Sequence, residues 1–77
     1  FVVPVNIQGI DKIGLINQIT EIISQQMNVN IQKFEFENKN GVFDCNVWPK
    51  VRDVNDGKLL CDKLKGVENV KSVARAD

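Results

Sequence analysis

The sequence predicts an α+β domain in which one four-stranded antiparallel sheet carries two helices on one of its faces. Segments that alternate apolar and polar residues enclose a segment of helical period, and this arrangement occurs twice along the chain. The pair Asn40-Gly41 then joins the two middle strand-like segments as a tight hairpin. The resulting order is typical of the split βαβ, ferredoxin-like βαββαβ sandwich.

The first part of the chain predicts a strand followed by an amphipathic helix. The strand covers Val2 to Ile7, with Val3, Val5 and Ile7 on its buried face. The helix starts at Gly14 and ends near Asn28, where a residue in the left-handed conformation is expected. Its apolar stripe consists of Leu15, Ile19, Ile22 and Ile23, widened by Ile16 and Met27.

The middle of the chain predicts two strands joined by the hairpin. The first covers Asn30 to Glu37, and the second covers Val42 to Val47 or extends to Val51. Their buried faces carry Phe34, Phe36, Phe43, Cys45 and Val47. Their opposite faces carry Lys33, Glu35, Glu37, Asp44, Asn46 and Trp48.

The last part of the chain predicts a second helix and a closing strand. The helix begins at Asp53 in a sequence like a capping box, with acidic side chains at the positive end of the helix dipole. Gly66 ends this helix, and the closing strand runs from about Val67 to Ala74. The apolar stripe of the helix consists of Val54, Leu60, Cys61 and Leu64, with Leu59 at its margin.

Size and composition predict one small domain. Residues 1–77 have room for a single core, so we expect further burial from a second copy or from a larger polypeptide of which this domain is part. A net charge of zero without a basic run argues against nucleic-acid binding. Every apolar segment is too short to span a membrane. Cys45 and Cys61 form no metal-type or redox-type pair, so we expect buried thiols and a cytoplasmic location, a disulfide between them being the alternative.

Three function classes that share this fold lack their residues here. A metal carrier needs paired cysteines in the first loop, and a phosphatase needs an arginine there and a nucleophile–base pair; the chain has neither, and it has no histidine. An RNA-recognition domain needs several aromatic residues on the open sheet face, where this chain offers only Trp48. We therefore expect no catalytic residue, no metal and no cofactor, and interpret Trp48, with Lys33 and Glu35, as a contact surface for another domain or copy.

The most informative segment is the junction Gly9–Ile16 between the first strand and the first helix. Its two glycines allow backbone N–H groups to point outward, and such groups bind a small anion. The structural alternative is that the glycines only permit the turn, while Asp11 caps the helix and Asn30 fixes the entry to the second strand. The start of the second strand is expected near this loop in a neighbouring copy, which favours a site between two copies.

The same junction carries a family resemblance. The pattern from Val5 to Ile16, continued by Ile19-Thr20, Ile22-Ile23 and Asn28 to Ile31, resembles an ACT domain. The tail from Val51 to Arg75 is similar to the C-terminal ACT domain of the RelA/SpoT family, whose members make and hydrolyse the alarmone (p)ppGpp. The resemblance covers essentially the whole chain.

This resemblance implies a non-catalytic regulatory module of a GTP pyrophosphokinase, a guanosine-bis(diphosphate) 3'-pyrophosphohydrolase or an enzyme with both activities in the stringent response. Such modules form homodimers by side-by-side or back-to-back ACT–ACT pairing, contact other domains of the parent enzyme, and in ribosome-responsive members help docking on the ribosome. In members that bind an amino acid, the effector lies at the interface. Loop amides at Gly14, Leu15 and Ile16 then hold its carboxylate, and the side chains of Asp11 and Asn30 contact it.

Two positions depart from the pattern of effector-binding ACT domains. Many members have Asn in place of Asp11 and Pro in place of Ile13. A carboxylate at Asp11 repels the carboxylate of an amino acid and attracts its ammonium group. Two other functions are therefore alternatives: an amino-acid-binding ACT domain of another metabolic enzyme, and a dimerisation module without a ligand.

Overall fold

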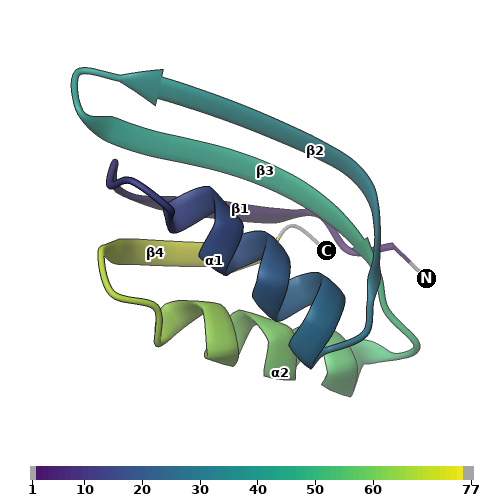
Figure 1. Cartoon of the computed structure of the whole chain (residues 1–77). Helices are drawn as coiled ribbons and strands as arrows, with labels where there is room; N and C mark the ends of the chain where they lie inside the picture. The colour runs from purple at the N-terminus through teal and green to yellow at the C-terminus, as the bar shows by residue number, and fades with distance from the viewer. Residues whose placement is uncertain (1, 76–77) are drawn as a thin grey trace.

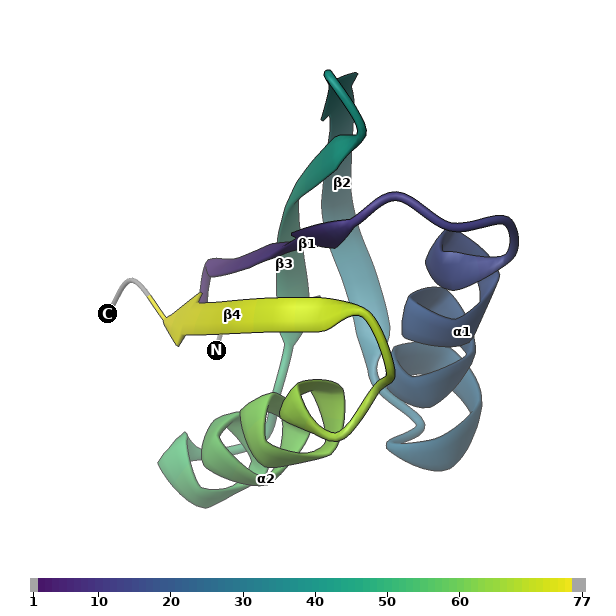
Figure 2. The ribbon, with the colours of Figure 1, turned by 90° about the vertical axis from the view of Figure 1, so that its left-hand side faces the viewer.

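A single antiparallel sheet in the strand order β2–β3–β1–β4 organises residues 2–75, which are the residues that the computed structural model describes (Figure 1). The elements along the chain are β1 (Val5–Ile10), α1 (Leu15–Glu21), the π-helical segment η1 (Ile22–Gln26), β2 (Asn30–Lys39), β3 (Val42–Lys50), α2 (Val54–Lys65) and β4 (Val70–Arg75). This is the ferredoxin-like βαββαβ order that the sequence predicts. Both helices lie on one side of the sheet, and among residues 2–75 no helix lies on its other side (Figure 2).

The hydrophobic core lies between the helices and the two central strands, β1 and β3. These strands pair in the register Val5–Val47, Ile7–Cys45 and Gly9–Phe43, so their core-facing residues share one face. The helices cover this face with the buried side chains of Leu15, Ile19, Ile23, Leu60, Cys61 and Leu64. The buried stripes of β1, β3 and the first helix are therefore as predicted.

Both cysteines are buried, which confirms the prediction of buried thiols. Cys45 lies in β3 at the centre of the core, next to Asp44 on the opposite face of the strand. Burial, and secondarily the charge of Asp44, raise the pKa of the Cys45 thiol from 9.0 to about 11.

The first helix changes its winding half-way. Beyond Glu21 the backbone continues as a π-helix, in which the Met27 N–H donates to the Ile22 carbonyl over 2.9 Å. The pattern of apolar residues does not distinguish this widened turn from an α-helix, and the sequence predicts only a single helix. Asn28 ends the helical segment with a φ of 54°, as expected for a left-handed residue.

Three strand boundaries differ from the prediction. β1 covers residues 5–10 rather than 2–7, because its pairing with β3 continues to Val42 beside Ile10. β2 continues to Lys39, up to the Asn40-Gly41 turn, whose positive φ angles of 56° and 77° are those the hairpin requires. β4 begins at Val70, because the preceding residue, Asn69, has a φ of 76° and forms a turn.

Two apolar residues were assigned to the core incorrectly by the sequence pattern. Phe36 is on the helix-facing side of β2 and its ring lies 5.0 Å from that of Phe43, but it is 40% exposed, because β2 is an edge strand of the sheet, whereas its partner Cys45 lies on the central strand β3. Val54 is 53% exposed, because it is the first residue of α2 and precedes the part of the helix that packs on the sheet. Gly57 is buried on that packed face instead.

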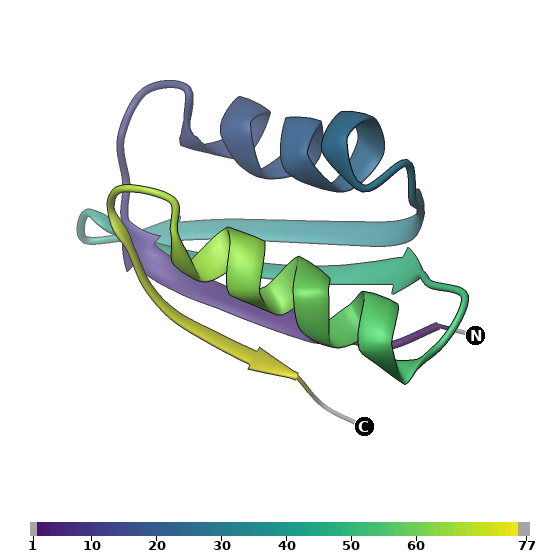
Figure 3. The same cartoon turned by 90° about the horizontal axis from the view of Figure 1, so that it is seen from below.

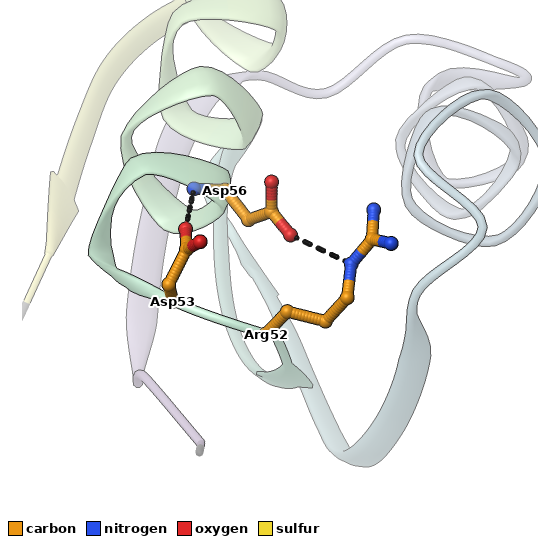
Figure 4. Close-up of polar contacts among 3 residues, drawn as sticks. All are labelled: Arg52, Asp53 and Asp56. Carbon is orange, nitrogen blue, oxygen red and sulfur yellow. Dashed lines mark hydrogen bonds and ion pairs between the residues drawn. The ribbon is translucent and has the colours of Figure 1, made fainter.

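The start of α2 confirms the predicted N-cap. The Asp53 carboxylate accepts a hydrogen bond of 2.9 Å from the Asp56 N–H, as drawn in Figure 4. The capping box is only half formed, because the Asp56 carboxylate accepts from Arg52 Nε over 3.1 Å. An acidic side chain in the first turn remains favourable toward the helix dipole.

Candidate functional site

The loop between β1 and α1 is anchored at its start by two backbone hydrogen bonds. The Ile10 N–H donates to the Asn69 carbonyl over 2.9 Å, and the Asp11 N–H donates to the Gly41 carbonyl over 3.0 Å. Gly9 precedes these bonds at a close backbone contact, because a Cβ atom there would lie 2.2 Å from the Asn69 carbonyl oxygen. The requirement for glycine at position 9 is therefore a matter of packing within β1, and not of the turn to which the structural alternative assigns it.

The end of the loop is open to solvent. Gly14 occupies the N-cap position of α1 with a φ of 85°, and no side chain of the described part of the chain caps the helix. The Leu15 N–H donates to the Lys12 carbonyl over 3.1 Å. Within residues 2–75, no acceptor faces the N–H groups of Ile13, Gly14 and Ile16. The loop thus retains free backbone donors that can bind an anionic group.

The interpretation of Asp11 as the helix cap is wrong. Its Oδ2 atom accepts a hydrogen bond from Asn38 Nδ2, so the carboxylate faces the end of β2 rather than the first turn of α1. The turn of the β2–β3 hairpin lies beside the loop, and this brings Asn38 into contact with Asp11 although the two residues are far apart in the sequence. Asp11 therefore contributes a negative charge at the side of the open loop.

Asn30 lies at the opposite end of the domain from the other candidate effector-binding residues. Figure 3 shows the β1–α1 loop and the β2–β3 turn at one end of the domain and the start of β2 at the other. Asn30 is the first residue of β2 and is exposed. Leu15 and Ile16 follow Gly14 directly; Leu15 is buried in the core, so only its backbone belongs to the loop. One protomer brings together Asp11, Gly14, Leu15 and Ile16, but not Asn30.

The three candidate interface residues lie together on the outer face of the sheet. The Lys33 ammonium lies 4.9 Å from the centre of the Trp48 ring, in a cation–π contact, and 3.5 Å from the Glu35 carboxylate. Lys33 is paired with Trp48 in the β2–β3 register, directly after a bulge in β2. The bulge and this pairing orient an aromatic ring and two opposite charges toward the same solvent-facing surface.

The rest of the outer face is polar. Asn6 Nδ2 donates to Asp44 Oδ1 and to Asn46 Oδ1, both over 2.8 Å, which links β1 to β3 across this face. Next to this network lies a shallow hollow of about 440 Å³, lined by Glu35, Phe36, Glu37, Asp44 and Asn46. Across residues 2–75, no group of His, Cys, Asp and Glu side chains is arranged to hold a metal ion. In the same residues, no helix has the length and apolar character needed to cross a membrane.

Sequence reasoning missed Asn38, Asn6 and Asn69, which support the loop and the outer face. Asn38 and Asn69 lie in segments rich in polar residues, where Asn is expected for turns alone. The strand register is the information that was needed: it places Asn38 opposite Phe43 at the far end of β2. The sequence pattern places Asn6, Asp44 and Asn46 on the outer face, but it does not predict the hydrogen bonds from Asn6 to the other two.

The fold, the open β1–α1 loop and the polar outer face are typical of small regulatory domains of the ferredoxin-like class. The chain belongs to the ACT domain family, because the model of this family matches residues 1–75. ACT domains are regulatory modules. A search of curated proteins finds no match to this chain.

Solved structures agree with the family. The crystal structure of the ACT domain from the GTP pyrophosphokinase of Chlorobium tepidum is 37% identical, with a TM-score of 0.89 over 99% of this chain and 97% of that one. The solution NMR structure of that ACT domain is 36% identical, with a TM-score of 0.87 over 100% of this chain and 86% of that one. A homoserine dehydrogenase from Thiobacillus denitrificans is 15% identical, with a TM-score of 0.78 over 96% of this chain and 16% of that one, and shares the fold alone.

Proposed function

We propose that this ACT domain is the regulatory domain of an enzyme that makes or hydrolyses (p)ppGpp. The observation that carries the proposal is the 37% identity over 99% of the chain with the ACT domain of a GTP pyrophosphokinase. In this proposal the domain performs no chemistry. It binds an effector and a second copy, and these contacts shift the parent enzyme between synthetase-favouring and hydrolase-favouring states.

Pairing between two copies occurs along β2. Among the strands of the described residues, none lies on the outer edge of β2, and a ten-residue edge strand favours pairing with another strand. Phe36, 40% exposed beside this edge, becomes covered when a second copy is present. An antiparallel register centred on Phe34 sets Lys33 opposite the partner's Glu35 on both sides of the two-fold axis, so charges of opposite sign face each other.

The same pairing completes the effector site. In antiparallel β2 strands, the first residue of one strand lies near the last residues of the other. Asn30 of one copy is then close to the partner's Asn38, which holds the partner's Asp11. The open N–H groups of Ile13, Gly14 and Ile16 bind the carboxylate of an amino acid, and Asp11 attracts its ammonium group. Each dimer then has two equivalent sites.

The outer face serves a different contact. Trp48, Lys33 and Glu35 bind other domains of the parent enzyme, and in the full-length protein this surface also contributes to docking on the ribosome. An aromatic ring with charges of both signs is typical of protein interfaces. A back-to-back arrangement of two ACT domains would use this face instead of the β2 edge.

Titration of the ¹⁵N-labelled domain with each of the twenty amino acids tests effector binding. We expect one amino acid, or a small chemical group of them, to shift the amide signals of Ile13, Gly14, Ile16 and Asn30 together. Asn30→Ala should abolish these shifts, while Gln32→Ala, an exposed position two residues along β2, should retain them. If all twenty leave the spectrum unchanged at millimolar concentration, effector sensing is contradicted and a dimerisation module without ligand is favoured.

Synthetase and hydrolase assays of the full-length parent enzyme test the regulatory role. Asn30→Ala should change the ratio of the two activities, or the response of the single activity to the effector, because it removes a contact of the regulatory site. A parent protein without nucleotide synthetase and hydrolase segments contradicts the assignment. The remaining candidate would then be an amino-acid-binding ACT domain of another metabolic enzyme.

A further inference from the structure

We propose that Asn38 is a positioning residue for the β1–α1 loop: by holding the Asp11 carboxylate against the end of β2, it keeps that carboxylate away from the N–H groups of its own loop. Its importance for effector binding rests on the function proposed above. The positioning itself is a property of the free domain and does not depend on any ligand.

Asp11 has a local alternative that this structure does not use. Aspartate side chains in loops commonly accept hydrogen bonds from the backbone N–H groups two and three residues further along the chain. For Asp11 these are the N–H groups of Ile13 and Gly14, and within residues 2–75 no acceptor faces either of them. The carboxylate is instead bonded through Oδ2 to Asn38 Nδ2. Asn38 thus competes with the loop for the same carboxylate.

The β2–β3 hairpin holds the loop by two separate links. The Asp11 N–H donates to the Gly41 carbonyl over 3.0 Å, which fixes the backbone of the loop to the turn. The side-chain bond between Asn38 and Asp11 is the second link, and Asn38 is itself fixed by its pairing opposite Phe43 in β3. The backbone link holds Asp11 near the hairpin whatever its side chain does. The direction of the carboxylate therefore depends on Asn38.

This arrangement keeps apart the two groups that bind a zwitterionic amino acid: the loop N–H groups for its carboxylate and the Asp11 carboxylate for its ammonium group. The open N–H groups remain available to a ligand carboxylate, because no carboxylate within residues 2–75 occupies them. Asp11 stays at the side of the loop, where its Oδ1 atom can accept from a ligand ammonium group while Oδ2 remains bonded to Asn38. Without Asn38, the Asp11 carboxylate would itself accept hydrogen bonds from the Ile13 and Gly14 N–H groups. These groups would then no longer be available to the ligand carboxylate.

Amide hydrogen exchange of the ligand-free domain tests this proposal. In Asn38→Ala the Ile13 and Gly14 amides should exchange about fivefold more slowly than in the unmodified domain, the protection that one side-chain-to-backbone bond of typical strength gives. In Asp11→Ala/Asn38→Ala the exchange should return to the original rate, because the competing carboxylate is absent. Lys39→Ala, an exposed position next to Asn38, is the matched control and should leave both amides unchanged.

Two results would overturn the proposal: unchanged exchange in Asn38→Ala, or slow exchange that persists in the double variant. A loss of folding is recognised from the core signals of Phe43 and Leu60. In that event the variant Asp11→Asn/Asn38→Asp replaces Asn38→Ala, since it re-forms the pair with donor and acceptor exchanged. The Ile13 and Gly14 amides should then keep their original rapid exchange. Slower exchange of these amides in this variant would contradict the proposal equally. Because no ligand is added, a failure of effector binding does not affect either outcome.

Discussion

Gly9 in β1 and Asn69 in the turn before β4 are in direct backbone contact, with room for a hydrogen atom but not for a methyl group. The Cβ of any other residue at position 9 would lie 2.2 Å from the Asn69 carbonyl oxygen and 3.0 Å from the Cα of Val70. The next residue, Ile10, donates its N–H to that same oxygen over 2.9 Å. The β1–α1 loop therefore begins at a fixed point, on which the geometry of the candidate effector site depends.

Gly9→Ala should destabilise the domain. Backbone atoms surround the added methyl group, so relief requires a shift of β4 against β1, and we expect a loss of about 1–3 kcal/mol in the free energy of unfolding. Gly57→Ala is the matched control: it is buried in α2, its Cβ would meet nothing closer than 3.8 Å, and alanine is the better helix former, with an expected gain of about 0.5–1 kcal/mol. Urea unfolding measures both. Equal stability of Gly9→Ala and the unmodified domain contradicts the close contact.

The two polar contacts at the start of α2 should differ in strength. Asp53→Ala removes the N-cap bond to the Asp56 N–H and should cost about 1 kcal/mol. Arg52→Ala removes an ion pair whose arginine side chain is 88% exposed, and should cost less than about 0.5 kcal/mol. Thermal and urea unfolding of the two variants compare them directly. A larger loss for Arg52→Ala would contradict this ranking.

The Cys45 thiol should make the stability of the domain fall at high pH. Burial, then the charge of Asp44, raise the pKa of this thiol to about 11, above its value of 9.0 in a solvated chain. The unfolded chain therefore loses its thiol proton first, and the stabilisation is present below pH 9.0 and is lost as the pH rises toward about 11. Urea unfolding at a series of pH values should show a flatter profile for Cys45→Ala in this interval. If the free energy of unfolding depends on pH in the same way in the unmodified domain and in Cys45→Ala, the raised pKa of the buried thiol is contradicted.

Reversal of one charge on the β2 edge should weaken the dimer. In the register centred on Phe34, Glu35→Lys sets like charges opposite each other at two symmetric positions, and we expect the dimer dissociation constant to rise about tenfold. Lys33→Glu/Glu35→Lys restores opposite charges and should restore most of the affinity. Sedimentation equilibrium measures all three proteins. Similar weakening in both variants, or a monomeric unmodified domain at high concentration, argues against pairing along β2 in this register.

Patterns of apolar residues were sufficient to predict the order of elements, because each element buries one face. The alternation of Val3, Val5 and Ile7 and the helical spacing of Leu15, Ile19 and Ile23 identify that face, and all six side chains are buried. Whether a strand lies at the edge or in the centre of the sheet is not encoded in such a pattern, and β2 lies at the edge. For that reason Phe36 alternates like a core residue but remains 40% exposed.

The candidate site was predicted less completely than the fold. The residues of the loop follow one another in sequence, so an open junction around Gly14 is predictable from its glycines. The partner of Asp11 is 27 residues away, at a position fixed by strand register. The local sequence predicts that the Asp11 side chain caps the first helix. In the structure it accepts a hydrogen bond from Asn38 in the β2–β3 hairpin instead. Long-range polar pairs of this kind require the tertiary structure.

Isotope-filtered NOE spectroscopy on a mixture of labelled and unlabelled copies tests the central claim most directly, because it detects only contacts between different chains. The account predicts intermolecular contacts from Asn30 of one copy to Asp11 and Ile13 of the other, which are separated by the length of the domain within one chain (Figure 3). Intermolecular contacts from Trp48 without any from Asn30 would place the dimer interface on the outer face. The effector loop would then lie outside the interface, contrary to the site proposed here.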